Sequence, residues 1–222
     1  MNIFDAIIIV CLILGIMAGL RRGLIREVVL LIGLILAIII SFNLRTPIAT
    51  FMYKNLPFIS FGGIFSGVGI INILLYEVLA FLIIFSIVYL ILRIILKITG
   101  FIEMILKATI ILGILSRIGG AIVGFIEAYL LVFIFLFILG QPFINIKMLN
   151  ESKVANRILD STPIMSSSIK NTRNAINEMY SLSEIYKSDK KSFNDEVIKL
   201  FIKYEIITSE NVNLLKEKGK LN

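Results

Sequence analysis

Four long apolar runs constrain this chain more than any other feature. Each is close to or longer than the roughly 20 residues that an α-helix needs to cross a hydrocarbon core of about 30 Å. Because a bilayer core offers no water to backbone polar groups, an isolated apolar run of this length crosses it as a helix. The pattern predicts an all-α, polytopic membrane protein with four transmembrane helices. The expected spans are residues 3–20, 24–44, 72–98 and 118–139.

The composition supports this class and divides the chain in two. Of 222 residues, 58% are hydrophobic and 17% are charged, against roughly 45–50% and about 25% in a soluble domain. Ten of the fifteen acidic residues lie beyond Gly140. We therefore expect a membrane domain over residues 1–142 and a polar, mainly helical tail over 143–222, whose apolar faces need a partner. In the tail, Ser192–Asp195 resembles a capping box at the start of a helix.

The residue inventory excludes several kinds of chemistry. The chain has no histidine, and its single cysteine, Cys11, lies in an apolar run, so a histidine-based triad and an intrachain disulfide are impossible. The acidic residues are scattered, and no phosphate-binding glycine loop is recognisable. We expect a protein that is not an enzyme and that has no metal or cofactor. The net charge of +7 is attributed to membrane topology and anionic headgroups, with no nucleic acid partner.

The basic residues between the spans predict the orientation. Two of them, Arg45 and Lys54, fall in the segment assigned to the outside. Seven fall in the segments assigned to the cytoplasm, namely Arg21, Arg22, Arg26, Arg93, Lys97, Lys107 and Arg117. Since cytoplasmic loops are enriched in Lys and Arg, both termini are expected outside the cytoplasm.

The short turn between the first two spans is the first candidate site. It is dense in charge, and we expect it to form an inner docking surface for lipid headgroups or a protein partner. The docking candidates are Arg21, Arg22, Gly23, Arg26, Glu27 and Arg117.

Two segments have less regular patterns. Residues 45–72 contain Pro47, Pro57 and a glycine-rich stretch over 61–69, which suits an outer loop in the membrane interface or, alternatively, a re-entrant segment. Residues 99–116 have apolar positions at helical spacing, so a short amphipathic helix on the inner surface is expected there.

Small residues recur four apart where helices could approach closely. In lipid, such positions supply packing energy because they let backbones touch. The packing is expected within one protomer or, alternatively, between protomers of a homo-oligomer. The positions are Gly15, Gly19, Gly33, Gly120, Gly124 and Ala128.

Three acidic residues fall in or beside the spans: Asp5, Glu77 and Glu127. A charge at mid-span costs about 2.5–3.5 kcal/mol on insertion scales. Glu127 is expected to form an ion pair with Arg117, Arg21 or Arg22. A site for ion or proton passage and a protonated, packed carboxylic acid are the alternatives.

Several motifs together resemble a known family. They are Asp5, then Arg22-Gly-Leu-Ile-Arg-Glu-Val28 and Gly33, then Ser116-Arg-Ile-Gly-Gly-Ala-Ile-Val-Gly124, and finally Ser152-Lys-Val-Ala followed by Thr162-Pro163. Over about residues 1–165 the chain resembles the colicin V production protein family of bacterial inner-membrane proteins. Ser116 stands where that family usually has an acidic or amide residue, so it is expected to keep a helix cap without a charge. Glu127 stands where the family often has a basic or small polar residue.

The resemblance implies a bacterial cytoplasmic-membrane protein linked to production or export of a secreted peptide toxin and to envelope homeostasis. The leading hypothesis is a non-enzymatic scaffold or accessory protein with an envelope or secretion protein as its partner. The alternative is a small oligomeric channel or transporter that uses the glycine-rich loop and the intramembrane acids.

Overall fold

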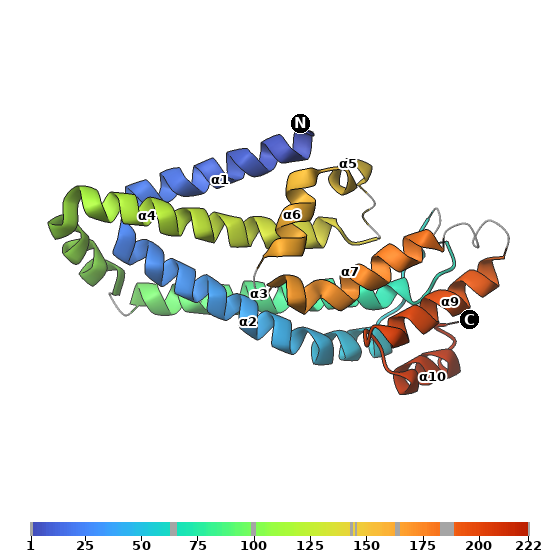
Figure 1. The fold of residues 1–222 in the computed structure, drawn as a ribbon. Helices are drawn as coiled ribbons and strands as arrows, with labels where there is room; N and C mark the ends of the chain where they lie inside the picture. The colour runs from blue at the N-terminus through green and yellow to red at the C-terminus, as the bar shows by residue number, and fades with distance from the viewer. Residues whose placement is uncertain are drawn as a thin grey trace. The chain divides into compact units, whose positions relative to one another are not determined.

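The computed structural model describes residues 2–62, 66–98, 101–142, 144, 146–162, 165–182 and 189–221, and only the backbone over most of 96–113. Helices joined by turns account for the described residues, which include no β-strand (Figure 1). The predicted all-α class is confirmed. The helices are α1 (Ile3–Arg22), α2 (Leu24–Asn55), α3 (Ile71–Ile98), α4 (Phe101–Leu139), α5 (Lys147–Asn150), α6 (Lys153–Ser161), α7 (Met165–Ser181), α9 (Lys190–Lys203) and α10 (Ser209–Glu217).

Four of these helices are long and apolar enough to cross a membrane, which confirms the predicted membrane class. The candidate spans are Ile3–Arg22, Leu24–Asn55, Ile71–Ile95 and Ile114–Leu139.

Helix boundaries depart from the sequence prediction in three places. The α2 helix runs through Pro47 to Asn55, where an irregular segment was expected from residue 45, because Ala49 and Tyr53 are buried in a core that holds the helix together. The α4 helix begins at Phe101 and continues into the fourth span without a break; the predicted surface position of 99–116 depends on side chains outside the described residues. The α9 helix is capped by Asp189, which accepts from the backbone N–H groups of Lys191 and Ser192, so it begins before the predicted capping box.

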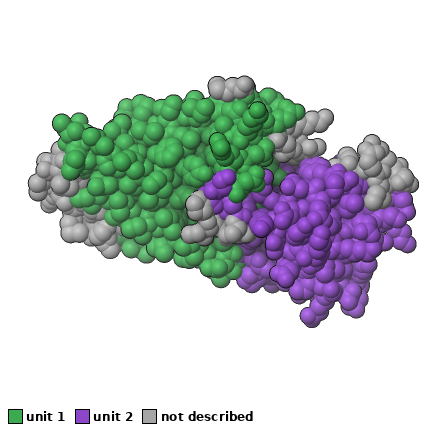
Figure 2. Space-filling view, viewed as in Figure 1, with its two compact units in different colours: residues 1–44, 81–140, 146–160 green, residues 45–80, 141–145, 161–222 purple. Residues whose placement is uncertain are grey.

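The chain divides into two compact units (Figure 2). Unit 1 comprises residues 1–44, 81–140 and 146–160, and unit 2 comprises residues 45–80, 141–145 and 161–222.

Unit 1 contains an antiparallel contact between α1 and α4. Gly15 faces Gly124 and Ala128, whereas Gly19, one turn later, faces Gly120. Elsewhere in the unit, Phe81 and Phe133 are buried, and the ring of Phe42 lies 5.0 Å from that of Phe81. Large apolar side chains are exposed along all four long helices, as expected of surfaces that face lipid.

Unit 2 buries the apolar faces of the polar tail. Its core includes Met179 of α7, Phe193 and Phe201 of α9, and Leu215 of α10. The first turns of α3 complete this core, since Ile71 is fully buried within it. The tail helices therefore find their apolar partner within the chain.

Candidate functional site at the turn between α1 and α2

A single residue, Gly23, separates α1 from α2 and permits the reversal of the chain. Its φ angle is +80°, a conformation that L side chains rarely adopt. Its N–H group continues the hydrogen bonding of α1 by donating to the Gly19 carbonyl oxygen at 3.0 Å. Gly23 is also buried. Its backbone conformation and the lack of room for a side chain therefore explain why glycine stands at this position of the Arg22–Val28 motif.

A cluster of three charged side chains, Arg22, Glu27 and Glu127, lies behind this turn. Arg22 Nη1 is 3.1 Å and 3.3 Å from the two carboxylate oxygens of Glu27 and 3.4 Å from Glu127 Oε2. The side chains of Glu27 and Glu127 are 0% and 11% exposed, and that of Arg22 is 37% exposed. One guanidinium therefore serves two carboxylates in a largely water-excluded place, and the cluster ties the start of α2 to α4.

The glycines of α1 and α4 make the space for this cluster. A Cβ atom on Gly124 would lie 3.1 Å from Glu27 Oε1 and 2.5 Å from the Gly15 carbonyl oxygen. A Cβ atom on Gly120 would lie 2.9 Å from the Gly23 carbonyl carbon and still closer to the Gly19 oxygen. Helix approach and carboxylate burial thus depend on the same positions. Gly33 lies outside this contact, since its nearest neighbour would be Leu92 Cδ1 at 4.0 Å.

Ser116 contributes a hydrogen bond across helices. It lies inside α4, so it does not cap the fourth span as the sequence predicted. Its hydroxyl oxygen accepts from the backbone N–H of Leu24 at 3.1 Å and satisfies a free donor in the first turn of α2. Ser116 caps α2 and not its own helix, because α4 has already begun before this residue. The backbone N–H that lacks an intrahelical partner is the one in the first turn of α2.

The predicted docking residues have different surroundings. Arg21 and Arg117 are exposed, and Arg26 is half-buried. Glu27 is buried against Arg22, and Gly23 is buried as well.

The motifs that form this site match a known family. The model of the colicin V production protein family matches residues 4–163. The chain belongs to that family. No curated protein and no solved structure matches it. Together with the four apolar helices, this membership makes the chain a membrane protein linked to colicin production.

The family-like motifs at the two ends of the matched region also meet within unit 1. Asp5 Oδ1 accepts from the Ser152 hydroxyl at 2.5 Å and from the Val154 N–H at 3.3 Å. Its other oxygen accepts from the Asn2 N–H at 2.9 Å and completes a capping box of α1. The Ser152 hydroxyl in turn accepts from the Ala155 N–H at 3.0 Å, in the first turn of α6. Asp5 was predicted to be an intramembrane acid, and the structure places it where it caps two helices.

The third predicted acid lies in unit 2. Glu77 is buried and interacts electrostatically with Arg45, a residue that the sequence pattern assigns to an outer loop. Arg45 is half-buried in the extension of α2. The partner was missed because residues 45–55 were not expected to be helical.

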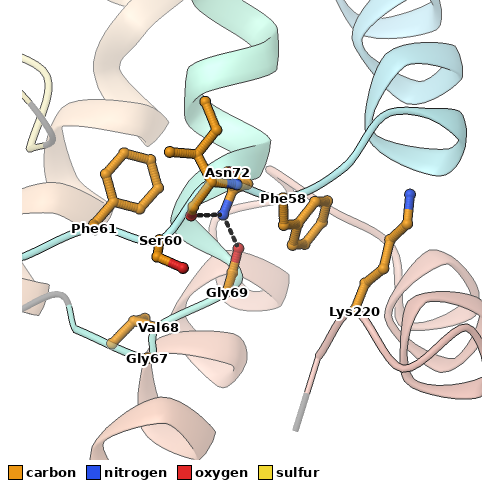
Figure 3. Close-up of a pocket in the computed structure, with 9 residues that line it drawn as sticks. Phe58, Ser60, Phe61, Gly67, Val68, Gly69, Asn72 and Lys220 are labelled. Carbon is orange, nitrogen blue, oxygen red and sulfur yellow. Dashed lines mark hydrogen bonds between the residues drawn. The ribbon is translucent and has the colours of Figure 1, made fainter.

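Unit 2 also contains a small cavity of about 170 Å³ beside the glycine-rich loop (Figure 3). The side-chain amide of Asn72 lines the cavity. Its oxygen accepts from the Ile59 N–H, and its NH₂ group donates to the carbonyl oxygens of Ile59 and Gly69. Phe58 and Lys220 line the other side. The cavity is smaller than the roughly 300–1,000 Å³ of ordinary ligand pockets. Residues 63–65 of the predicted glycine loop lie outside the described residues.

Lys220 organises the edge of this cavity. Its ammonium group donates to the carbonyl oxygens of Tyr53, Lys54 and Leu56 at 2.8–3.0 Å and so caps the end of α2. Burial lowers the pKa of Lys220, and the neighbouring Lys218 lowers it further. The Lys220 ammonium group therefore has a structural role at the end of α2. In the part of the chain that the structure describes, no three His, Cys, Asp or Glu residues converge as a metal site would require.

Proposed function

We propose that this member of the colicin V production protein family is a non-enzymatic scaffold or accessory protein of the bacterial cytoplasmic membrane. It would support production or secretion of a peptide toxin and envelope homeostasis. One observation carries the proposal: the buried acids are held by partners within the fold. Glu27 and Glu127 share Arg22, and Asp5 caps α1 and α6. The positive charge of Arg45 also acts on Glu77.

This pairing favours a structural use of the acids. An isolated charge in a span is costly, by about 2.5–3.5 kcal/mol on insertion scales. A carboxylate that already has a guanidinium or several N–H and O–H donors offsets that cost by fixing one helix against another. Acids used in this way hold a rigid frame on which a partner can assemble.

The frame would present a basic surface to the cytoplasm. Arg21, Arg26 and Arg117 are not engaged in the Arg22 cluster, and we propose that they bind anionic headgroups or an envelope or secretion protein. The orientation rests on the excess of basic residues assigned to the cytoplasmic side. Both termini would then lie outside the cytoplasm, in agreement with the contact between Asp5 and Ser152, which follows the fourth span.

The test is complementation with a double variant, Arg21→Gln with Arg117→Gln, in cells that lack the native protein. We expect toxin export and envelope integrity to be lost while abundance and membrane insertion stay normal. The matched control is Lys170→Gln with Lys216→Gln, which removes the same charge from exposed tail positions. Full function in the arginine variant would refute the docking surface.

A second candidate is a small oligomeric channel or transporter. It is favoured by the imbalance of the Arg22 cluster, in which two carboxylates share one guanidinium. The test is ion flux through the purified protein in liposomes beside a protein-free preparation. Flux that Glu127→Gln alters would replace the scaffold proposal; flux equal to that of empty liposomes, with insertion verified, would remove the channel.

A further inference from the structure

Unit 2 has a surface of two kinds. Among its described residues, the large apolar side chains that are exposed all fall between positions 48 and 59. They are Ile48, Phe51, Leu56 and Ile59, exposed by 36%, 69%, 42% and 56%. We call these four residues the apolar strip. The described parts of α7, α9 and α10 add no exposed large apolar side chain to it.

The apolar strip begins within a candidate membrane span and continues directly after it. The span Leu24–Asn55 contains Ile48 and Phe51, and Leu56 and Ile59 follow it in the chain. Exposed apolar side chains also occur in earlier turns of α2, at Ile40 and Leu44. The strip therefore adjoins a helix that crosses the membrane.

The length of α2 places the strip near the membrane surface. A helix of 32 residues is about 48 Å long at 1.5 Å per residue, whereas the hydrocarbon core is about 30 Å thick. The last turns of α2 therefore extend beyond the core. Their inner face is buried through Ala49 and Tyr53, and only the strip remains apolar and uncovered.

Basic groups accompany the strip. Lys54 lies between Phe51 and Leu56 in sequence, and Lys218 is held beside it by a hydrogen bond from its Nζ to the Lys54 carbonyl oxygen at 3.2 Å. Elsewhere in the unit, two exposed lysines of α9 are paired with carboxylates, Lys199 with Glu196 and Lys203 with Glu178. An apolar row beside lysines complements the acyl chains and anionic phosphates of a bilayer interface.

We propose that the apolar strip is a lipid-binding surface that seats unit 2 in the membrane interface. Its four side chains lie at the boundary between the acyl chains and the headgroups, and Lys54 and Lys218 contact anionic phospholipid phosphates. The occupant is the bilayer in which the protein resides. The proposal is independent of the scaffold function, since a channel could be seated in the same way.

The experiment uses the full chain with Cys11→Ser and one environment-sensitive fluorophore attached at Phe51→Cys or Ile59→Cys. Matched controls carry the fluorophore at Glu210→Cys or Asn213→Cys, which are exposed positions of α10. Each protein is reconstituted in phosphatidylcholine vesicles with or without phosphatidylglycerol. Aqueous iodide and a phospholipid with a shallow spin label serve as the two quenchers.

We expect labels at 51 and 59 to emit at shorter wavelength, to be quenched by the spin-labelled lipid, and to resist iodide several-fold better than labels at 210 and 213. Equal iodide quenching at all four positions would overturn the proposal. Protection from iodide without quenching by the lipid would also overturn it, because protein would then cover the strip. Phosphatidylglycerol should increase the lipid quenching, and Lys54→Gln with Lys218→Gln should abolish that increase; no effect of phosphatidylglycerol would overturn the headgroup contact.

Discussion

Both units bury aromatic rings, but the glycine contact between α1 and α4 belongs to unit 1. In unit 1, α1 and α4 meet at glycines whose backbones touch, and charged side chains fill the space beside them. In unit 2, large side chains such as Phe193 and Phe201 are fully buried among helices with polar outer faces.

The difference reflects the solvent that each unit faces. In water, burying a large apolar side chain is itself favourable, by about 1.5–3 kcal/mol. In lipid, exchanging acyl chains for another helix gains little, so close backbone contact and interhelical polar bonds must supply the stability. Substitutions of buried rings, of glycines and of charged residues test the difference between burial of large side chains and close backbone contact.

Truncation of a buried ring separates the two units most clearly. We expect Phe201→Ala to reduce the free energy of unfolding of unit 2 by about 3–5 kcal/mol, because it removes a fully buried side chain and leaves a cavity. Phe135→Ala makes the same chemical change on a lipid-facing position of unit 1 that is 55% exposed, and it should cost less than about 1 kcal/mol. Hydrogen exchange resolved by segment measures both; equal losses would contradict the lipid-facing position of Phe135.

Enlargement of a glycine tests the close helix contact of unit 1. Gly120→Leu should destabilise unit 1 by about 3 kcal/mol, near the upper end for overpacking, because the atoms it meets belong to the backbone and cannot move aside. Gly33→Leu is the control, since nothing lies closer than 4.0 Å to a Cβ there. Thermal unfolding in detergent compares them, and similar melting of the two variants would show that the glycine contact is not tight.

Substitutions within the Arg22 cluster should reduce the free energy of unfolding by different amounts. Arg22→Gln leaves two carboxylates without a cation, and we expect a loss of about 1–2 kcal/mol, less than the 3–5 kcal/mol of a fully buried pair because Arg22 is 37% exposed. Glu127→Gln should cost less, since Arg22 keeps Glu27. Both variants are compared by thermal unfolding in nanodiscs. A larger loss for Glu127→Gln than for Arg22→Gln would contradict this order and show that Glu127 stabilises the fold through more than its contact with Arg22.

The smallest effect concerns pH and unit 2. The Tyr204 hydroxyl donates to Glu178, and Lys203 lies 3.0 Å from the same carboxylate; these contacts hold the pKa of Glu178 below its usual value of 4.5. Since the folded-state pKa is depressed, the contribution is present above pH 4.5 and is lost as the pH falls through the lower folded-state pKa. Glu178→Gln should flatten the acid side of the melting profile of unit 2. An unchanged profile would show that the contact adds nothing measurable.

The sequence by itself determined the features that depend on local composition. Runs of about 20 apolar residues can only cross a bilayer as helices, so the all-α class and the four spans followed from the sequence. Small residues at four-residue spacing identified the faces of α1 and α4 that the structure places together. The motifs at Arg22–Val28 and Ser116–Gly124 identified the family, which the match over residues 4–163 confirms.

Only the tertiary structure decided which partners distant residues take. The sequence placed Arg22 within reach of Glu127, but not Glu27 in the same cluster, and it assigned Ser116 to the wrong helix end. It also could not show that the tail would bury the start of α3, because an apolar helical segment has the same pattern whether lipid or protein covers it. Side-chain pairing and burial depend on contacts between residues on different helices, such as Arg22 with Glu127 and Leu24 with Ser116, and those contacts arise only when the helices pack.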